Sequence, residues 1–275
     1  MRPRVSNIVA INTTIHMNQR HSFLRTIAKI FCPIVSLAIL LGFAQVASAQ
    51  SASPLAQSTQ LLLVTTADWD TVGGTLHRFA RADTKAEWSE IGTPIPIVVG
   101  RNGLGWGLGL NPKTKAKGPV KKEGDGKSPA GIFRLSSAFG FAAPADMKNI
   151  KLPYQQLTDQ IECVDDVKST NYNSVVDRGH FASPDWNSSE KMKTVGQYRL
   201  GVVVDHNTDP REPGSGSCIF LHIWKDAQTG TSGCTAMSSS NIDVVVPWLD
   251  PAANPVLVQL PNSDYHKLRA KWQLP

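Results

Sequence analysis

The sequence lacks the features that define several large protein classes. Its first 49 residues contain no acidic side chain and five of the 28 basic ones, which leaves 23 basic against 22 acidic residues in the remainder. This near-neutral balance provides no electrostatic surface for a polyanion, so we expect no nucleic-acid partner. Beyond residue 49 no apolar run reaches the length of a membrane span.

Signatures of metal and cofactor sites are missing as well. The segment Gly103–Leu110 does not match G-x-G-x-x-G, and the triplet Gly126–Ser128 has Lys121 where a phosphate-binding loop requires glycine. No H-E-x-x-H occurs, and the paired spacing of zinc ligands is not found at His77, His180 and His206. We therefore expect neither a metal nor a cofactor.

An export signal is predicted over residues 1–49. Two basic residues precede the apolar run Ile30–Ala44, which is followed by a small-x-small pattern that ends at Ala49. A charged start, a short apolar stretch and a small-residue end are typical of a secretory signal, here cleaved after Ala49, with Met17 as an alternative start. An uncleaved membrane anchor is the competing interpretation. We expect membrane contact only during export.

The exported chain is predicted to be mainly β with a few short helices, as a single large domain or as two small ones. Residues 50–60 are small and polar and predict a flexible linker, so the folded part occupies residues 61–275. A helix is predicted to begin near 239–241, although the run Val244–Pro247 that follows disfavours helix. Another helix is predicted at 263–272. Residues 136–195 predict a loop-rich excursion. Short runs bounded by turn residues predict strands at 61–66, 75–80, 95–99, 103–110, 198–204, 217–223 and 256–260.

Three cysteines follow the predicted signal, at Cys163, Cys218 and Cys234. An odd number in an oxidising compartment leaves at least one thiol unpaired. Cys163 and Cys218 either form a disulfide or are two buried thiols that pack as small apolar side chains. If they are bridged, Cys234 is the free thiol.

The combination of His222 with Cys234 indicates nucleophilic chemistry. Cys234 ends the small-residue turn Thr231–Ser232–Gly233–Cys234, and eleven residues separate it from His222, whose strand alternates so that Cys218 lies on the same face. A loop of that length can bring an imidazole to a thiol and activate it, and a helix that begins soon after the cysteine adds its dipole. Small residues leave the amides of Gly233 and Cys234 free for a developing oxyanion. These parts fit acyl transfer through a thioester, whereas a satisfied core histidine is the alternative for His222.

Other polar positions have two interpretations. Asp205 and His206 end a strand beside the histidine strand, where they either flank the site or are solvated strand-end residues. Asn207 and Trp224 are further candidates for substrate contact. Residues 113–127 contain six lysines and form either a solvated loop or a loop that contacts substrate.

The histidine strand and the nucleophile turn resemble the signature of the L,D-transpeptidase catalytic domain (YkuD-type). Similarity extends from about Leu61 to Leu260. The segments that carry it, besides 222–234, are Lys122–Gly131 (KEGDGKSPAG), Glu162–Asp166, Asn171–Asn173 and Tyr198–Asn207.

The resemblance implies a mixed β-sheet curved around a catalytic cleft and an enzyme of the periplasm or cell wall. By analogy, Cys234 attacks the third residue of a peptidoglycan tetrapeptide stem and expels the terminal D-alanine. The side-chain amine of a second stem then resolves the thioester and cross-links the third residues of two stems. His222 carries over as general base, oriented by a backbone carbonyl, and we expect a monomer.

Two positions depart from the pattern. Many members have histidine where this chain has Ser232, and arginine where it has Ala236. Loss of that arginine removes an anchor for a substrate carboxylate or carbonyl. The alternatives to a transpeptidase are a secreted cysteine L,D-carboxypeptidase or amidase that uses the same pair, and a non-catalytic cell-wall-binding module.

Overall fold

The computed structural model describes residues 53–111 and 117–275 of the chain. The signal peptide predicted over 1–49, with its alternative start at Met17, lies outside the described residues and stays a prediction. In the two described segments no helix combines the length and the apolar character that a membrane crossing requires.

The domain is mainly β, as predicted, and its helices are short. The helices are α1 (Ser239–Trp248) and α2 (Asn262–Trp272). The strands are β1 (Gln60–Thr66), β2 (Gly73–Ala80), β3 (Ser89–Glu90), β4 (Ile95–Val98), β5 (Leu104–Trp106), β6 (Ser128–Gly140), β7 (Tyr154–Gln156), β8 (Ile161–Val164), β9 (Ser174–Asp177), β10 (Ser189–Lys191), β11 (Leu200–Val204), β12 (Phe220–Ile223), β13 (Thr235–Met237) and β14 (Val256–Pro261).

Most strands belong to one large mixed sheet with the order β1-β14-β6-β11-β12-β13-β4-β2-β3. Strand β1 pairs with β14 in parallel and with β2 in antiparallel orientation, so the path returns to its first strand and the sheet is barrel-like. Strands β12 and β13 are also parallel. The second sheet, β10-β8-β9, is called the small sheet below.

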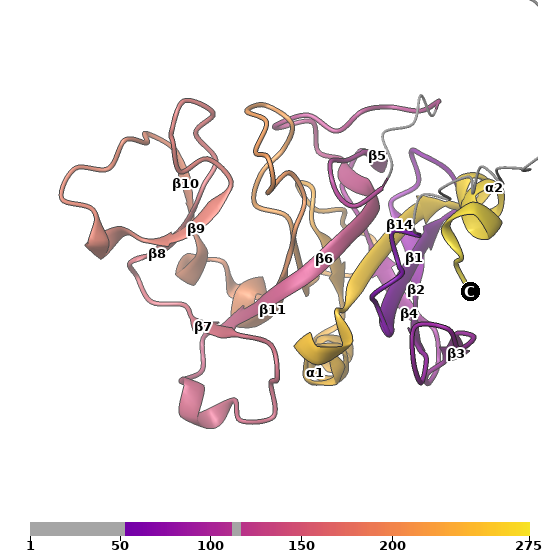
Figure 1. Ribbon diagram of the computed structural model, residues 1–275. Helices are drawn as coiled ribbons and strands as arrows, with labels where there is room; N and C mark the ends of the chain where they lie inside the picture. Colours follow the sequence, from indigo (N-terminus) through magenta and orange to yellow (C-terminus); the bar gives the residue numbers. More distant parts are fainter. Residues whose placement is uncertain (1–52, 112–116) are drawn as a thin grey trace, which may run out of the picture. The chain divides into compact units, whose positions relative to one another are not determined.

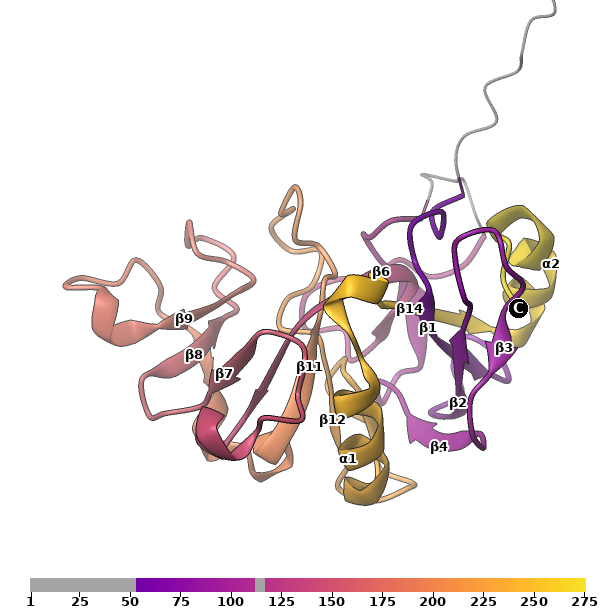
Figure 2. The ribbon, with the colours of Figure 1, turned by 60° about the horizontal axis from the view of Figure 1, so that its bottom comes forward.

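The long strand β6 organises the domain and was not predicted from the sequence. It pairs with β14 and β11, and the short strands β5 and β7 lie along it. Its proline, glycines and serines resemble turn formers, but Ala130, Ile132 and Phe133 are wholly buried. Tertiary burial therefore overrides local propensity here. Figures 1 and 2 show the small sheet on one side of β6, with β1, β2 and α2 on the other.

Helix α1 forms despite its unfavourable composition. Ser238 accepts a hydrogen bond from the amide of Asn241 and caps the first turn. Ile242, Val245 and Val246 are buried in the main core, where the helix packs on β11 and β12. Packing of this apolar face outweighs the low helix propensity of the valines, and the proline is tolerated in the last turn.

The packed domain begins earlier than the sequence predicts. Leu55, within the predicted linker 50–60, is 1% exposed and belongs to a buried cluster with Trp272. Arg81 donates hydrogen bonds to the carbonyls of Leu55 and Ser58. Residues 53–60 are therefore part of the fold rather than a flexible linker.

The excursion predicted over 136–195 is partly regular. The end of β6 and strands β7 to β10 lie within it, together with short 3₁₀ turns. Glu162 on β8 is 1% exposed and accepts hydrogen bonds from Trp186 and Ser189. Arg178 and Lys191 also form ion pairs with this carboxylate. A buried, fully partnered charge thus holds the small sheet together, a contact that local pattern cannot reveal.

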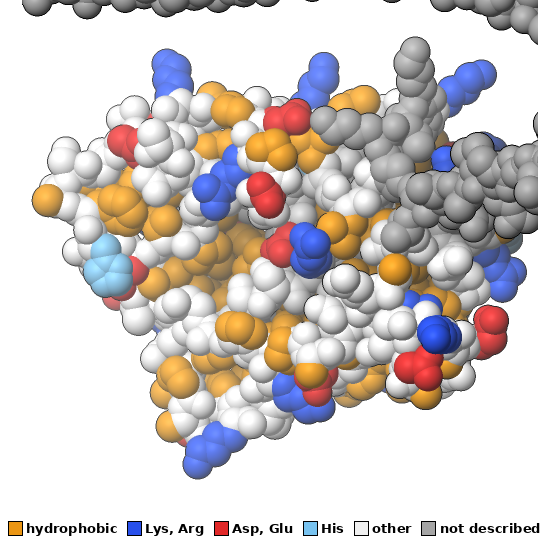
Figure 3. Space-filling view, in the orientation of Figure 1, with side chains coloured by type: hydrophobic (Ala, Val, Ile, Leu, Met, Phe, Trp, Pro, Cys, Tyr) orange, Lys and Arg blue, Asp and Glu red, His pale blue; other side chains and the backbone are white. Residues whose placement is uncertain are grey.

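Lys and Arg side chains are scattered over the face drawn in Figure 3, and some of them lie beside an acidic side chain. Outside the grey atoms, that face carries no continuous basic patch.

Candidate active site

One cavity of about 540 Å³ holds both residues that the sequence singles out. Cys234 and His222 line it, together with Trp224. Its walls come from the loop 121–124, the small sheet, strand β12 and the turn that precedes β13. The large sheet and the small sheet therefore meet at this cavity.

Parallel pairing of β12 with β13 brings the thiol to the imidazole strand. His222 is in register with Ala236, and the amide of Phe220 donates a hydrogen bond to Cys234 Sγ at 3.3 Å. The return loop packs closely: a side chain at Gly230 would meet the backbone of Arg101 at 2.6 Å. Glycine at this position lets the loop fold back, as the spacing of the two residues predicts.

Strand β12 is shorter than the predicted strand 217–223. It begins at Phe220, because Cys218 adopts a left-handed conformation with φ of 54°. The predicted alternation of 218, 220 and 222 on one face is therefore interrupted at its first member. The same conformation leaves the Cys218 carbonyl as a hydrogen-bond acceptor for the Cys234 thiol at 3.5 Å.

The imidazole of His222 is oriented by the backbone. Its Nδ1 donates to the carbonyl of Ile223 at 2.7 Å, which leaves Nε2 as the acceptor nitrogen. The ring of Tyr198 packs edge-on against it with 5.1 Å between centroids. Burial lowers the pKa of His222 from 6.5 to about 4, so the ring is neutral at pH 7.

Cys234 is a protonated thiol in this state. Burial, and to a smaller extent the charge of Glu190, raises its pKa to about 12. The hydrogen bond from the Phe220 amide, the neighbouring Tyr198 hydroxyl and the charge of Lys121 act in the opposite direction. Within the described residues no hydrogen bond joins the thiol to His222; the thiol donates to Cys218 instead. The resting pair is therefore thiol and neutral imidazole.

The turn before β13 is held rigidly around the carbonyl of Cys234. That oxygen accepts from Thr231 Oγ1 at 2.6 Å and from Ser128 Oγ at 2.7 Å. Ser128, wholly buried on β6, also accepts from the amide of Gly100 at 2.8 Å. The Ser128 hydroxyl thus connects strand β6 to the turn that precedes β13.

The expectation that both turn amides are free is wrong for Gly233. Its amide donates to Thr231 Oγ1 at 3.1 Å. The amide of Cys234 makes no hydrogen bond to any described residue, so of the two turn amides it is the one left available to a ligand. Ser232 is directed elsewhere, since its hydroxyl accepts from Arg101 at 3.2 Å. The predicted helix dipole is not adjacent either, because β13 separates α1 from the cysteine.

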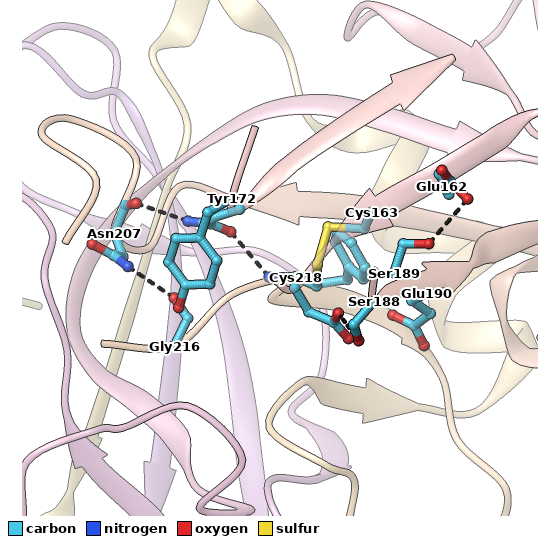
Figure 4. The surroundings of a disulfide bond; sticks show 12 residues. Glu162, Cys163, Tyr172, Ser188, Ser189, Glu190, Asn207, Gly216 and Cys218 are labelled. Atoms are coloured by element: carbon cyan, nitrogen blue, oxygen red, sulfur yellow. Dashed lines mark hydrogen bonds between the residues drawn. A yellow bond between two sulfur atoms is a disulfide. The ribbon is translucent and has the colours of Figure 1, made fainter. Parts of the chain in front are cut away.

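A disulfide ties the small sheet to the cavity wall. Figure 4 shows the bond between Cys163 on β8 and Cys218. Their Cα atoms are 6.0 Å apart. Cys234 is free. The amide of Cys218 donates to Asn173 Oδ1 at 3.0 Å, and the Asn173 amide group donates to the carbonyls of His206 and Asn207. These contacts fix the backbone next to the thiol.

Three of the four flanking candidates lie outside the cavity. Asp205 accepts from Ser136 and lines a different pocket together with Asn207. His206 is 1% exposed and bonded to the backbone, so it is a satisfied core histidine. Only Trp224 lines the cavity of the thiol.

Sequence reasoning missed the side chains that surround the thiol. Tyr198 donates to both carboxylate oxygens of Glu190, at 2.9 and 3.0 Å, and both residues line the cavity. Lys121 is also a lining residue, although it belongs to the lysine-rich run 113–127. Neither spacing nor residue type distinguishes Glu190 or Lys121 from surface charges, so no local signal identified them.

The fold and this cavity define a mainly β domain with a buried cysteine–histidine pair and no metal-binding cluster among the described residues. The family described as YkuD, L,D-transpeptidase catalytic domain, matches residues 79–258, more than half of the chain. The chain therefore belongs to the L,D-transpeptidase catalytic domain family, as the resemblance predicts. Neither curated proteins nor solved structures gave a match.

Proposed function

We propose that this chain is an exported L,D-transpeptidase that forms a thioester on Cys234 with peptidoglycan stem peptides. The observation that carries the proposal is the shared cavity of Cys234 and His222, with Nδ1 of the histidine bound to a carbonyl and Nε2 left to take a proton. In this proposal the large mixed sheet curves around the cleft that receives the stem.

In the first half-reaction Sγ of Cys234 attacks the carbonyl of the third stem residue. His222 Nε2 accepts the thiol proton, and the amide of Cys234 donates to the carbonyl oxygen as it becomes negative. The proton then passes from Nε2 to the nitrogen of the terminal D-alanine. The carbon–nitrogen bond breaks, D-alanine leaves and the thioester remains.

In the second half-reaction the side-chain amine of another stem attacks the thioester. His222 takes a proton from that nitrogen and returns it to the departing sulfur, so the free thiol is restored and an amide has formed. Water in place of the amine would release a tripeptide, which is the carboxypeptidase alternative.

Because Cys234 and His222 are both neutral at rest, their pKa values decide at which point of the reaction the thiol proton moves to the imidazole. With the pKa of Cys234 near 12 and that of His222 near 4, proton transfer to the imidazole accompanies attack rather than precedes it. Because His222 stays unprotonated above its pKa, the general base is available throughout the neutral and mildly acidic range.

Export is part of the same proposal. A disulfide such as Cys163–Cys218 persists in oxidising compartments, which supports a periplasmic or wall-associated location. We propose that residues 1–49 are the signal peptide, that it is cleaved after Ala49, and that the mature protein is a monomer.

Product analysis with purified tetrapeptide stems tests the reaction. The expected products are D-alanine and stem dimers, lost in Cys234→Ala and His222→Ala but kept in His180→Ala, which alters an exposed histidine outside the cavity. Free tripeptide without dimers would establish the hydrolase instead. Neither product would reject enzymatic function on these stems.

A carbapenem adduct provides an independent test of the nucleophile. Intact-protein mass spectrometry should show covalent addition that disappears in Cys234→Ala. Binding to cell-wall material without an adduct would favour the wall-binding module.

A further inference from the structure

A buried ion pair lies in the loop that borders the nucleophile turn. Lys121 is 4% exposed, and its Nζ donates to Asp125 Oδ1 and to the carbonyl of Lys122, both at 2.6 Å. The Asp125 carboxylate also accepts from the amides of Lys122 and Lys127. A buried lysine that is paired and hydrogen-bonded in this way is held in one position.

Two glycines give the lysine stem its path toward the thiol. A Cβ at Gly216 would lie 3.0 Å from Lys121 Cε, and a Cβ at Gly233 would lie 3.8 Å from the same atom. Lys121 therefore packs directly on the residue before Cys234, and it lines the same cavity. Any side chain at Gly216 would compete with the stem for this space.

Ala236 cannot supply a charge at this site. It is wholly buried in β13 and lies between Val98 of β4 and His222 of β12 in the sheet. Position 236, where many members of the family have arginine, is thus buried within the large sheet. Lys121 is the buried cation among the described residues that line the cavity.

Charged and titratable groups from several elements surround the thiol. Glu190 on β10 raises the pKa of Cys234, whereas Lys121 lowers it. Tyr198 and His222 also line the cavity, as do the charged residues Glu123, Asp165 and Lys225. Around Lys121 itself, Asp125 carries the opposite charge and His206 is neutral because burial lowers its pKa to about 4.

We propose that Lys121 is a positioning residue whose ammonium, held by Asp125 against the Gly233 turn, stabilises the developing thiolate of Cys234. The proposal rests on Cys234 being the nucleophile of the proposed function. It assigns to the loop 121–125 the positive charge that Ala236 does not provide.

The test is the alkylation rate of Cys234 by iodoacetamide between pH 7 and pH 10, followed on the Cys234 peptide by mass spectrometry. Below the thiol pKa this rate is proportional to the thiolate fraction, so a change of one in pKa changes it about tenfold. We expect Lys121→Met to react about threefold more slowly and Lys121→Arg to react at close to the wild-type rate. Lys122→Met, an exposed neighbour in the same loop, should be unchanged.

Asp125→Asn separates charge from structure. Removing the negative partner leaves the Lys121 ammonium uncompensated, so we expect faster alkylation of Cys234 in Asp125→Asn. If Lys121 only supports the loop, Asp125→Asn and Lys121→Met should instead change the alkylation rate in the same direction. If Lys121→Met does not fold, as judged by circular dichroism, the arginine and asparagine variants decide. Equal rates in all folded variants, or slower alkylation in Asp125→Asn, would overturn the proposal.

Alkylation does not depend on the acyl-transfer reaction, so the two proposals fail separately. Loss of the lysine effect in a protein that still makes stem dimers would reject only the role of Lys121. A lysine effect in a protein that yields no dimer, tripeptide or adduct would reject only the transpeptidase.

Discussion

His206 is buried in a neutral form that two backbone contacts specify. Its Nδ1 accepts from the amide of Leu108 at 3.2 Å, and its Nε2 donates to the carbonyl of Ser215 at 2.9 Å. If Nδ1 were protonated, its N–H would face the N–H of Leu108, and neither donor would have an acceptor there. Burial is the main cause that lowers the pKa of His206 from 6.5 to about 4.

The free energy of unfolding should therefore fall as the solution is made acidic. The unfolded chain takes up this proton near pH 6.5, whereas the native protein does so only near pH 4, so the unfolded state binds more protons between these values. The resulting loss is nearly absent at pH 7, about 2 kcal/mol at pH 5 and about 3 kcal/mol at pH 4. His222, with its pKa also near 4, contributes a similar loss.

Urea unfolding followed by tryptophan fluorescence at pH 7 and pH 5 measures this loss. Wild-type protein should lose about 4 kcal/mol and His206→Gln about 2 kcal/mol, because one titrating group has been removed. His180→Gln, which alters an exposed histidine, should behave as wild type. Carboxylates are common to all variants, so their contributions cancel in the comparison. An equal loss in His206→Gln and wild type would refute the reasoning.

Three further changes have definite expected outcomes. Ser128→Ala leaves the Gly100 amide without its acceptor, so thermal unfolding should show a loss of about 1–3 kcal/mol, with slower thioester formation in the carbapenem assay. Replacing Cys163 and Cys218 together by alanine should lower the free energy of unfolding in urea by about 2–4 kcal/mol, since the bridge closes a separation of 55 residues. An unchanged urea midpoint would contradict this. Glu190→Gln should speed iodoacetamide alkylation of the Cys234 thiol, because the carboxylate raises the pKa of that thiol; slower alkylation would show that the hydrogen bond from Tyr198 to residue 190 matters more than the charge.

Local sequence patterns predict much of the fold. Strands β1, β2, β4, β11 and β14 and helix α2 lie at or within two residues of the predicted ranges. Their alternation and flanking turn residues are properties of short segments, which is why they can be read without a structure. Strand β6 escaped prediction because its turn-forming residues are extended only when β14 and β11 pair with it.

The site was predictable where it depends on residue type and spacing. Cys234 and His222 stand out because eleven residues separate a strand histidine from a thiol that ends a turn of small residues, although the same spacing is compatible with a core histidine. Glu190 and Lys121 could not be found in this way, because a charged residue in sequence has no mark that distinguishes a buried position from an exposed one.

The sequence by itself determined the family, the mainly β character and the choice of Cys234 and His222 as the candidate pair. Each of these depends on residues that are near one another in the chain. Only the tertiary structure decided the rest: which turn amide is free, where the disulfide holds the small sheet, and which charges face the thiol. These depend on pairings between segments as distant as Ser128 and Cys234, 106 positions apart. Burial then changes the pKa of Cys234 and His222 in opposite directions, and burial is a property of the folded chain alone.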